Sequence, residues 1–311
     1  MKTLRRRLLE TYLYGMALAV GAALLMCVAI SPAVAQEEGE GIGEAGTDPR
    51  DFAPKFMPYY RYTELENGLE QNEVVVFGLV AFSNKFAMTY EIPLAMERDV
   101  TNTALNGAGG TPGVCSAPTG QVPVPPATPT LPNGIKAEGD CEETGLGDMN
   151  LRFMYRLDWN FLGADWLVGS EFWFPTATDD VLGTEKFRIA PMITPIWDLG
   201  FWPAPGAFMA LMNFYEFDAF GETSRGDISM YKGRYFWMLP LHRSGIYALP
   251  EIQFIYDFEN SDSSFWFGPE FGKLLAPGRI IYVKPGWGIA TDSLSGERDF
   301  TFEFGFRYFF D

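Results

Sequence analysis

The clearest pattern in the chain is an alternation of two residue types over residues 299–310, next to the C-terminus. Small or charged residues alternate there with the aromatic side chains of Phe300, Phe302, Phe304, Phe306, Tyr308 and Phe310. A period of two is that of a β-strand, because successive side chains of a strand point to opposite faces. The segment is therefore predicted to be a strand with one aromatic face and one small or charged face.

The same alternation recurs along most of the chain after residue 54. It is clearest over residues 85–97 and 147–157, where apolar side chains alternate with threonine, asparagine, acidic residues and arginine. We expect twelve strands in all. Their predicted ranges are 55–63, 73–82, 85–97, 147–157, 165–175, 186–197, 207–217, 228–240, 246–258, 264–274, 279–290 and 299–310.

Strands with one apolar and one polar face can turn the apolar face either to a protein core or to lipid. A soluble β-sandwich or a lipocalin-like barrel would bury the aromatic face, but such folds use fewer long strands and less aromatic surface. Membrane barrels instead point apolar residues to lipid and polar residues to the lumen. The sequence thus predicts an all-β fold, a transmembrane antiparallel β-barrel of about 12 strands over residues 55–311.

The connections between these strands alternate in length. Short connections are predicted at residues 83–84, 158–164, 198–206, 241–245 and 275–278. The connections between them include the longest, 98–146, and acidic segments at 176–185 and 218–227. Because membrane barrels have short periplasmic turns and longer extracellular loops, residues 98–146 are predicted to be an extracellular loop.

The N-terminal segment has the features of a secretory signal peptide. It has a basic opening, an apolar run over residues 12–30 and the small-residue site Ala33-Val34-Ala35. Residues 1–35 are therefore predicted to be a signal peptide. The alternative is an uncleaved membrane anchor, since the apolar run approaches the length of a spanning helix. No later apolar run reaches that length, so a membrane role would use strands.

Charge and composition describe the segment that follows. Cleavage would remove four bases and one acid, which moves the formal net charge from −17 to −20. A surface with this much negative charge repels nucleic acid, so no nucleic-acid partner is expected. Residues 36–54 are acidic and glycine-rich, and they are predicted to be a flexible acidic leader before the barrel.

Three motifs resemble the outer-membrane proteins grouped under the MetA pathway of phenol degradation. These motifs are Gly145-Leu146-Gly147-Asp148 opening a strand, Pro175-Thr176 ending the next strand, and Gly183 preceding a basic strand. The resemblance covers about residues 144–194. It implies a monomeric barrel of a family that is described as transporters and is linked to aromatic compounds.

The last strand resembles the C-terminal signal strand of bacterial outer-membrane barrels, which ends on an aromatic residue. Here Asp311 follows Phe310, which is a departure from that pattern. This resemblance implies the outer membrane of a Gram-negative bacterium as the location. The expected partners are outer-membrane lipid and lipopolysaccharide, the outer-membrane assembly machinery acting through the C-terminal strand, and a small-molecule solute.

Two cysteines remain after removal of the signal peptide, Cys115 and Cys141, and both lie in the predicted loop 98–146. Two cysteines in one extracytoplasmic loop are expected to form a disulfide bond, and two free thiols are the alternative. The loop has no histidine nearby, so a metal site is not expected there.

The candidate chemistry for catalysis is sparse. The one histidine, His242, falls in a predicted turn, and a hydrolase would need a nucleophile, a base and an orienting group together. The short Gly-x-Gly pieces lack the strand-turn-helix context of a phosphate site. We therefore expect no enzyme, no cofactor and no metal.

The most informative charged residues are those at the alternate strand positions that would face the lumen. An arginine or lysine facing lipid near the bilayer midplane would cost roughly 2–4 kcal/mol, so these residues should point inward, with acids and bases compensating across neighbouring strands. The lumen-lining candidates are Glu91, Arg152, Arg156, Glu171, Lys186, Arg188, Lys232, Arg234, Glu251, Asp257, Glu270, Lys284, Glu303 and Arg307.

Two functions remain open. The first is an outer-membrane channel or transporter for small solutes, with aromatic or hydrophobic compounds among the candidates. The second is a non-conducting structural or adhesive surface barrel that works through its long, disulfide-closed loop. A barrel of twelve strands is intermediate in width between filled eight-stranded and open sixteen-stranded barrels, so the strand count does not separate these two.

Overall fold

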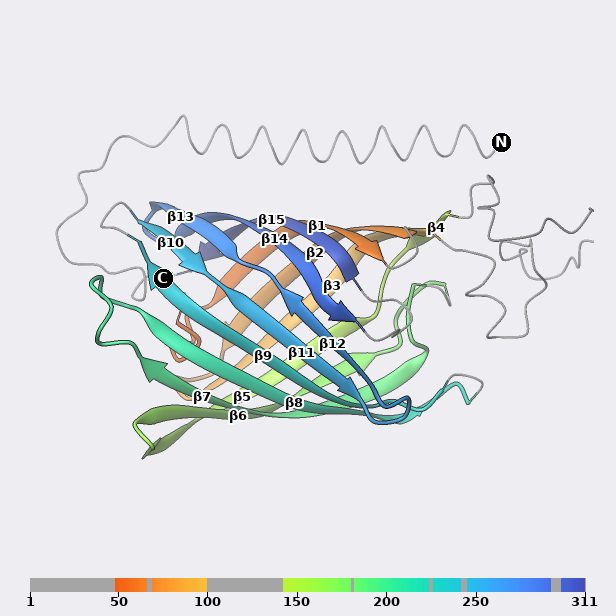
Figure 1. Ribbon diagram of the computed structural model, residues 1–311, viewed down its shortest axis with the longest axis horizontal. Helices are drawn as coiled ribbons and strands as arrows, with labels where there is room; N and C mark the ends of the chain where they lie inside the picture. Colours follow the sequence, from red (N-terminus) through yellow and green to blue (C-terminus); the bar gives the residue numbers. More distant parts are fainter. Residues whose placement is uncertain are drawn as a thin grey trace, which may run out of the picture.

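The computed structural model describes residues 48–65, 69–99, 142–179, 182–223, 226–241, 245–291 and 298–310. They form a closed antiparallel β-barrel of twelve strands, as predicted (Figure 1). In this described part of the chain, no helix is long and apolar enough to cross a membrane. The predicted signal peptide 1–35, Cys115, Cys141 and His242 lie outside the described residues, so what was predicted for them stays a prediction.

Strand breaks divide the twelve barrel strands into fifteen segments. The segments are β1 (Lys55–Leu65), β2 (Leu69–Ala81), β3 (Phe86–Asp99), β4 (Glu142–Gly145), β5 (Met149–Phe161), β6 (Ala164–Phe174), β7 (Lys186–Asp198), β8 (Phe208–Gly221), β9 (Ser229–Pro240), β10 (Ile246–Leu249), β11 (Glu251–Asp257), β12 (Asp262–Phe267), β13 (Glu270–Ala276), β14 (Arg279–Thr291) and β15 (Arg298–Phe309).

Three barrel strands are each made of two segments. β3 pairs with both β4 and β5, β9 with both β10 and β11, and β14 with both β12 and β13. Pro250 separates β10 from β11, and Pro269 lies between β12 and β13. A proline has no N–H for the ladder, so it interrupts the pairing without ending the strand.

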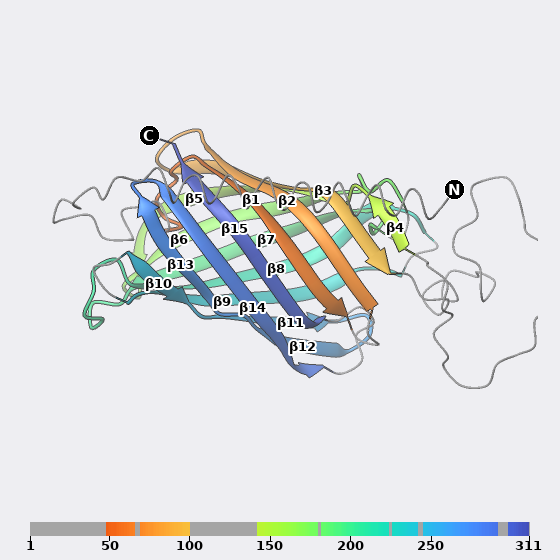
Figure 2. The ribbon, with the colours of Figure 1, turned by 90° about the horizontal axis from the view of Figure 1, so that it is seen from above.

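The aromatic C-terminal strand closes the barrel. β15 lies between β14 and β1 (Figure 2), and its pairs with β1 include Lys55 with Phe309 and Arg61 with Glu303. The backbone N–H of Phe310 also donates to the carbonyl of Pro54, at 2.9 Å. Closure pairs each described segment except β4 with a strand on both sides, which removes the long free edges of an open sheet.

The barrel has two distinct rims. We call the rim where β1 begins and β15 ends the terminal rim, and the opposite one the loop rim. The described connections at the terminal rim are short, as expected. The predicted connection 158–164 was too long, because β5 continues to Phe161 and turns at Leu162-Gly163, whose φ angles are 56° and 69°. Residues 158–161 are exposed on both faces, so no buried face imposes an alternation there.

The inner face of the barrel is not polar throughout. Along β8, starting from the terminal rim, the buried inward side chains are Phe208, Ala210, Met212 and Phe214, and only then Glu216. β6, β7, β9 and the β10–β11 strand show the same order, apolar near the terminal rim and charged beyond it. The expectation of a polar lumen is therefore wrong for the ends of β6 to β11 next to the terminal rim.

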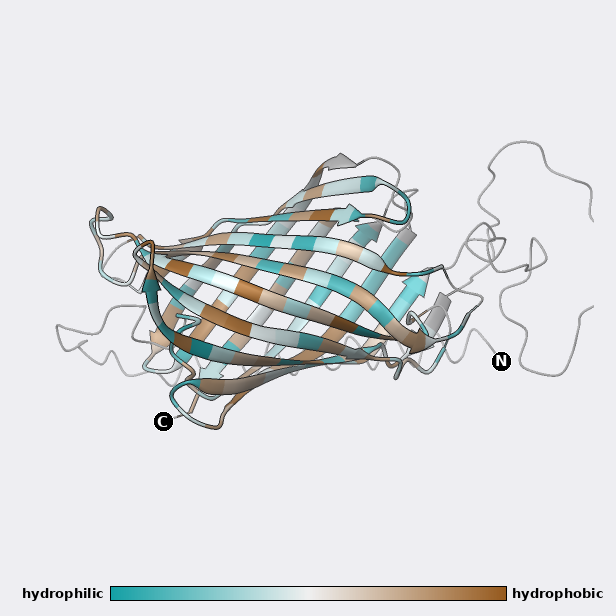
Figure 3. Ribbon diagram, turned by 90° about the horizontal axis from the view of Figure 1, so that it is seen from below, coloured by the Kyte–Doolittle hydropathy of each residue, from teal (hydrophilic) through white to brown (hydrophobic). Residues whose placement is uncertain are grey.

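An apolar cluster packs inside the barrel on the side of the terminal rim. Its members are Phe52, Leu79, Ala87, Met154, Leu167, Ala190, Met192, Ile196, Phe208, Ala210, Met212, Phe214, Phe236, Met238, Tyr247, Leu249, Ile280 and Phe309. Apolar residues near the terminal rim therefore occupy both faces of the wall. Figure 3 shows hydrophobic and hydrophilic positions alternating along the strands farther from that rim.

Candidate functional site

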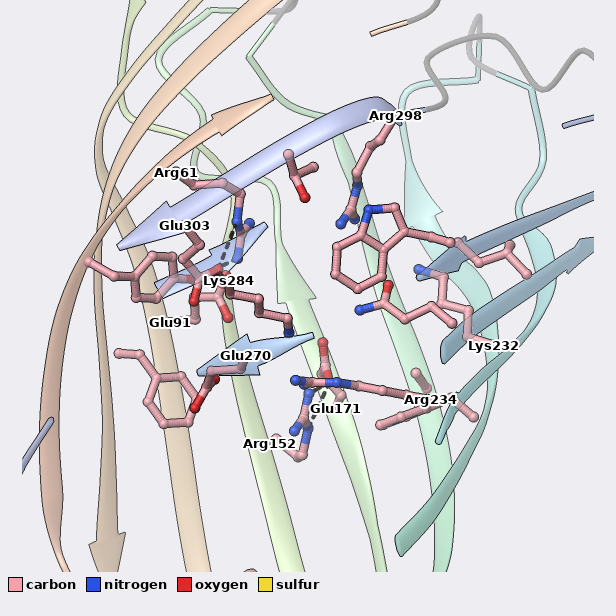
Figure 4. Close-up of a pocket in the computed structure, with 18 of the residues that line it drawn as sticks. Arg61, Glu91, Arg152, Glu171, Lys232, Arg234, Glu270, Lys284, Arg298 and Glu303 are labelled. Carbon is pink, nitrogen blue, oxygen red and sulfur yellow. Dashed lines mark hydrogen bonds and ion pairs between the residues drawn. The ribbon is translucent and has the colours of Figure 1, made fainter. Parts of the chain in front are cut away.

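A cavity of about 310 Å³ lies inside the barrel, beyond the apolar cluster (Figure 4). Its wall combines aromatic and charged side chains from strands all around the barrel. The aromatic ones are Tyr59, Phe77, Trp173, Phe214 and Trp266. The charged ones are Arg61, Glu91, Arg152, Glu171, Glu216, Lys232, Arg234, Glu270, Lys284, Arg298, Glu303 and Arg307.

The structure places nine of the fourteen lumen-lining candidates in this wall. They are Glu91, Arg152, Glu171, Lys232, Arg234, Glu270, Lys284, Glu303 and Arg307. Arg188 and Glu251 stand just behind the wall, where they bind residues that line it. Whether a solute passes these residues stays a prediction.

Three candidates lie away from the cavity. Lys186 pairs with Asp218, at 2.6 Å, at the loop rim end of β7. Asp257 accepts backbone hydrogen bonds from the turn after β11. Arg156 donates to the carbonyl of Arg50 near the terminal rim. All three lie on the inward face of their strand but near one of its ends. The alternation predicts which face a side chain occupies, but it does not predict how far along the barrel axis the side chain lies.

Glu251, just behind the wall, is the most deeply buried acid around the cavity, with 0% of its surface exposed. Its carboxylate accepts from Arg234 Nε at 2.6 Å, from Lys284 Nζ at 2.8 Å and from Gln253 Nε2 at 2.6 Å. Lys284 belongs to β14 and Glu251 to β11, so this contact crosses the strand that lies between them. Two cations therefore depend on one carboxylate.

A second group joins charge to tyrosine. Arg307 donates to Glu270 at 2.6 Å and to the hydroxyl of Tyr247 at 3.0 Å. That hydroxyl in turn donates to Glu270 at 2.7 Å, so the three side chains form a closed triangle. On another part of the wall, the hydroxyl of Tyr282 donates to Glu303 at 2.8 Å.

Arg61 is the centre of a third group. It pairs with Glu73 at 3.2 Å and with Glu303 at 3.3 Å, and it donates to the hydroxyl of Tyr59 at 2.9 Å. The hydroxyl of Tyr59 in turn donates to the carboxylate of Glu91, at 2.9 Å. Neither Arg61 nor Glu73 was predicted at the site. Arg61 stands between Tyr60 and Tyr62 in a strand with aromatic residues on both parities, which hides its orientation in the sequence.

The remaining pairs join neighbouring strands. Arg152 and Glu171 face each other directly in the β5–β6 register, and Arg152 Nε donates to Glu171 at 2.8 Å. Arg188 pairs with Glu216 at 2.6 Å, and Lys232 binds the other oxygen of the same carboxylate. Glu216 was not predicted because the residues before it on the same face of β8 are apolar. The sequence did contain a signal: a single acid on an apolar face is costly to bury, which indicates that it has a basic partner.

Aromatic rings lie flat against the inner wall over glycines of the neighbouring strand. A Cβ at Gly305 would meet Tyr282 at 2.6 Å, one at Gly272 would meet Tyr247 at 2.2 Å, and one at Gly286 would meet Trp266 at 2.0 Å. A larger residue at any of these positions would require its ring to move, and of the three rings that of Trp266 lines the cavity. The glycines therefore help to keep the middle of the barrel hollow.

Residues 48–54 cover the terminal rim. Arg50 binds Asp48, Asp165 at 2.9 Å and Asp198 at 2.6 Å, and Phe52 joins the apolar cluster with 5% of its surface exposed. We expected a flexible leader over residues 36–54. In residues 48–54 the structure shows these contacts instead, and residues 36–47 lie outside the described part.

At the loop rim, the three motifs that carry the family resemblance come together. The carboxylate of Asp148 accepts from the backbone N–H of Ala177 at 3.2 Å and from the N–H and hydroxyl of Thr184 at 2.8 and 2.9 Å. Thr176 Oγ1 accepts from the N–H of Met149 at 2.9 Å. A Cβ at Gly183 would lie 2.6 Å from Asp148 Oδ1. These residues hold the start of β5 against the connection between β6 and β7, which is a structural role.

The described ranges hold no group of three His, Cys, Asp or Glu side chains arranged to bind a metal ion. Each acid of the cavity wall accepts a hydrogen bond from arginine, lysine or tyrosine.

Comparisons with known proteins identify the fold. The "COG4313 outer membrane channel from Pseudomonas putida F1" is similar with a TM-score of 0.56 and 11% identity, over 90% of this chain and 100% of that one. The NanC porin is similar with a TM-score of 0.50 and 8% identity, over 83% of this chain and 100% of the porin. At such identities the likeness shows a shared outer-membrane barrel fold.

Comparisons of the sequence with known families and proteins do not assign this chain to a family. No family model matches the chain, and no curated protein matches it. The resemblance to the MetA pathway group therefore stays a hypothesis that rests on the motifs at residues 144–194.

Proposed function

We propose that this chain is an outer-membrane β-barrel channel for small solutes. The observation that carries the proposal is the cavity of about 310 Å³ with twelve charged side chains in its wall. Apolar filling stabilises a barrel at least as well as buried ion pairs do. A barrel that only anchored a surface loop would therefore gain nothing from such a chamber. The fold shared with an outer-membrane channel supports the location in the outer membrane.

The wall also supports a class of solute. Five aromatic side chains lie among the charges, so a solute with an apolar or aromatic part can contact rings while its polar part contacts ionic groups. This combination favours small amphipathic compounds, in line with the expectation of aromatic or hydrophobic solutes.

The chamber is obstructed toward the terminal rim. The apolar cluster lies between the chamber and that rim, and residues 48–54 lie across the rim, held by the contacts of Arg50 and Phe52. Passage through the barrel therefore requires residues 48–54 and part of the cluster to move. The same closure favours the second candidate function, a non-conducting surface barrel that works through loop 98–146.

Conductance in planar lipid bilayers separates the two functions. The wild type should show small or rare openings, and deletion of residues 48–54 should increase the open probability because the terminal rim loses its cover. The exposed ion pair Lys85–Asp158 provides a control, since Asp158→Asn changes a charge near the same rim without touching residues 48–54. A wild type and a deletion variant that both fail to conduct, although folded, would favour the structural or adhesive barrel.

A further inference from the structure

We propose that the cavity binds a small organic anion, with Arg298 as the residue that receives its oxyanion group. This inference rests on the proposed function and names the charge of the solute. It follows from which polar groups of the wall are already engaged and which are not.

The charged groups around the cavity almost balance. With Glu73, Arg188 and Glu251, which bind residues of the wall, the belt contains eight cations and seven carboxylates. Every one of the seven carboxylates accepts a hydrogen bond from an arginine, a lysine or a tyrosine. Seven of the eight cations have a carboxylate partner. Among these eight cations of the belt, Arg298 is the one for which the described part of the chain shows no carboxylate partner.

Arg298 reaches the cavity because the strand pairing is irregular. The register between β1 and β15 shifts at Glu64 and Leu65, where Leu65 pairs with Arg298. Regular alternation would place residue 298 on the outer face, together with Phe300 and Phe302. The shift turns its guanidinium to the inside, and Figure 4 shows it beside the cavity with no ion pair drawn to it.

The buried side-chain atoms of the wall that lack a hydrogen-bond partner are also donors. Among described residues that line the cavity, the buried side-chain atoms without a hydrogen-bond partner are Trp173 Nε1, Trp266 Nε1 and Arg307 Nε. Each carries an N–H, and none is an acceptor. A ligand that satisfies them must supply acceptor oxygens.

Charge then selects among ligands that carry such oxygens. A carboxylate would accept from Arg298 and would neutralise the one unmatched cation of the belt. A cationic ligand would meet Arg298 and find every carboxylate already engaged. A neutral alcohol would leave the charge of Arg298 unpaired. The structure therefore favours a small carboxylate-type anion, whose carbon body contacts aromatic side chains such as Trp266 and Phe77.

The test is a binding titration on the full chain purified from outer membranes in detergent. Butyrate, butan-1-ol and butylammonium have the same carbon length, and each is added at constant ionic strength while tryptophan fluorescence is followed, because Trp173 and Trp266 line the cavity. Butyrate should give a saturable change, and the other two should give none. A saturable response to butan-1-ol equal to that of butyrate would overturn the inference, and so would the absence of any response to butyrate.

Two variants locate the site. Arg298→Gln should weaken butyrate binding by about tenfold, the loss expected for one charge-assisted hydrogen bond. Arg279→Gln removes an exposed arginine at the terminal rim and should leave the affinity unchanged. If Arg298→Gln does not fold, Trp266→Phe replaces it: a smaller aromatic ring remains, one N–H donor is lost, Trp173 still reports binding, and the affinity should fall several-fold. An unchanged affinity in the folded variant would contradict the assignment.

Binding in detergent is read without any flux, so it separates this inference from the proposed function. A chain that binds butyrate but never conducts would overturn the channel and keep the anion site. A chain that conducts but does not bind butyrate would overturn the anion site alone.

Discussion

The two halves of the barrel interior differ in the interactions that hold them together. Next to the terminal rim, inward side chains such as Leu167, Phe208 and Met238 pack as an apolar core. Farther along the same strands, the inward positions carry arginine, lysine and glutamate in ion pairs. Apolar contacts depend mainly on size and shape, whereas a buried ion pair depends on both partners being present.

This difference indicates where the structure serves more than stability. The apolar half would hold the barrel closed with many different sequences of similar volume. The charged half is expensive to desolvate, and its pattern of engaged acids and one unengaged arginine is specific. We therefore infer that the charged half carries the function and that the apolar half controls access to it.

The largest effect is expected for Glu251→Ala in the charged half. The substitution leaves Arg234 and Lys284 without their shared carboxylate, and it should cost about 3–5 kcal/mol, as expected when one partner of a buried pair is removed. Urea unfolding of the refolded barrel in detergent measures the change. Asp158→Asn, at an exposed pair, should change stability by less than about 0.5 kcal/mol. If both variants are equally stable, the ion pairs of the belt are not coupled as described.

A pair of substitutions at Leu167 tests the apolar half. Leu167 is 1% exposed, so Leu167→Ala should cost about 2–5 kcal/mol by opening a cavity, whereas Leu167→Met, which keeps the volume, should cost less than about 1.5 kcal/mol. The same unfolding experiment applies. The comparison with Glu251 is sharpened by Glu251→Gln, which also keeps the volume but should remain strongly destabilising. Equal tolerance at the two positions would remove the distinction between the halves.

Of the three main substitutions, the smallest effect on stability is expected for Gly305→Ala in the charged half. It displaces the ring of Tyr282, whose hydroxyl binds Glu303 of the cavity wall, and this should cost about 1–3 kcal/mol and narrow the chamber. Single-channel conductance should fall in consequence. Gly200→Ala is the matched control, since a Cβ there meets nothing within 4 Å. A normal conductance in Gly305→Ala would mean that the ring does not border the path.

The sequence by itself determined the number of strands, their antiparallel order and the inward parity of most charges. These properties follow from the period of two, which is local: Phe302 and Glu303 differ in face because they are neighbours in one strand. The short connections at one rim follow in the same way from residue counts. Nine of the fourteen predicted charged residues accordingly stand in the cavity wall.

Only the tertiary structure decided what lies opposite each side chain and at what height. Glu216 shares its parity with phenylalanine and methionine, and it is buried inside because Arg188 and Lys232 on the neighbouring strands pair with it. Arg298 faces the cavity because the pairing with β1 shifts by one position. Parity is a property of one strand, whereas register, closure and the contacts of Arg50 with Asp165 and Asp198 join residues far apart in the chain. No local pattern contains that information, which is why the apolar half and the unpaired arginine were not predicted.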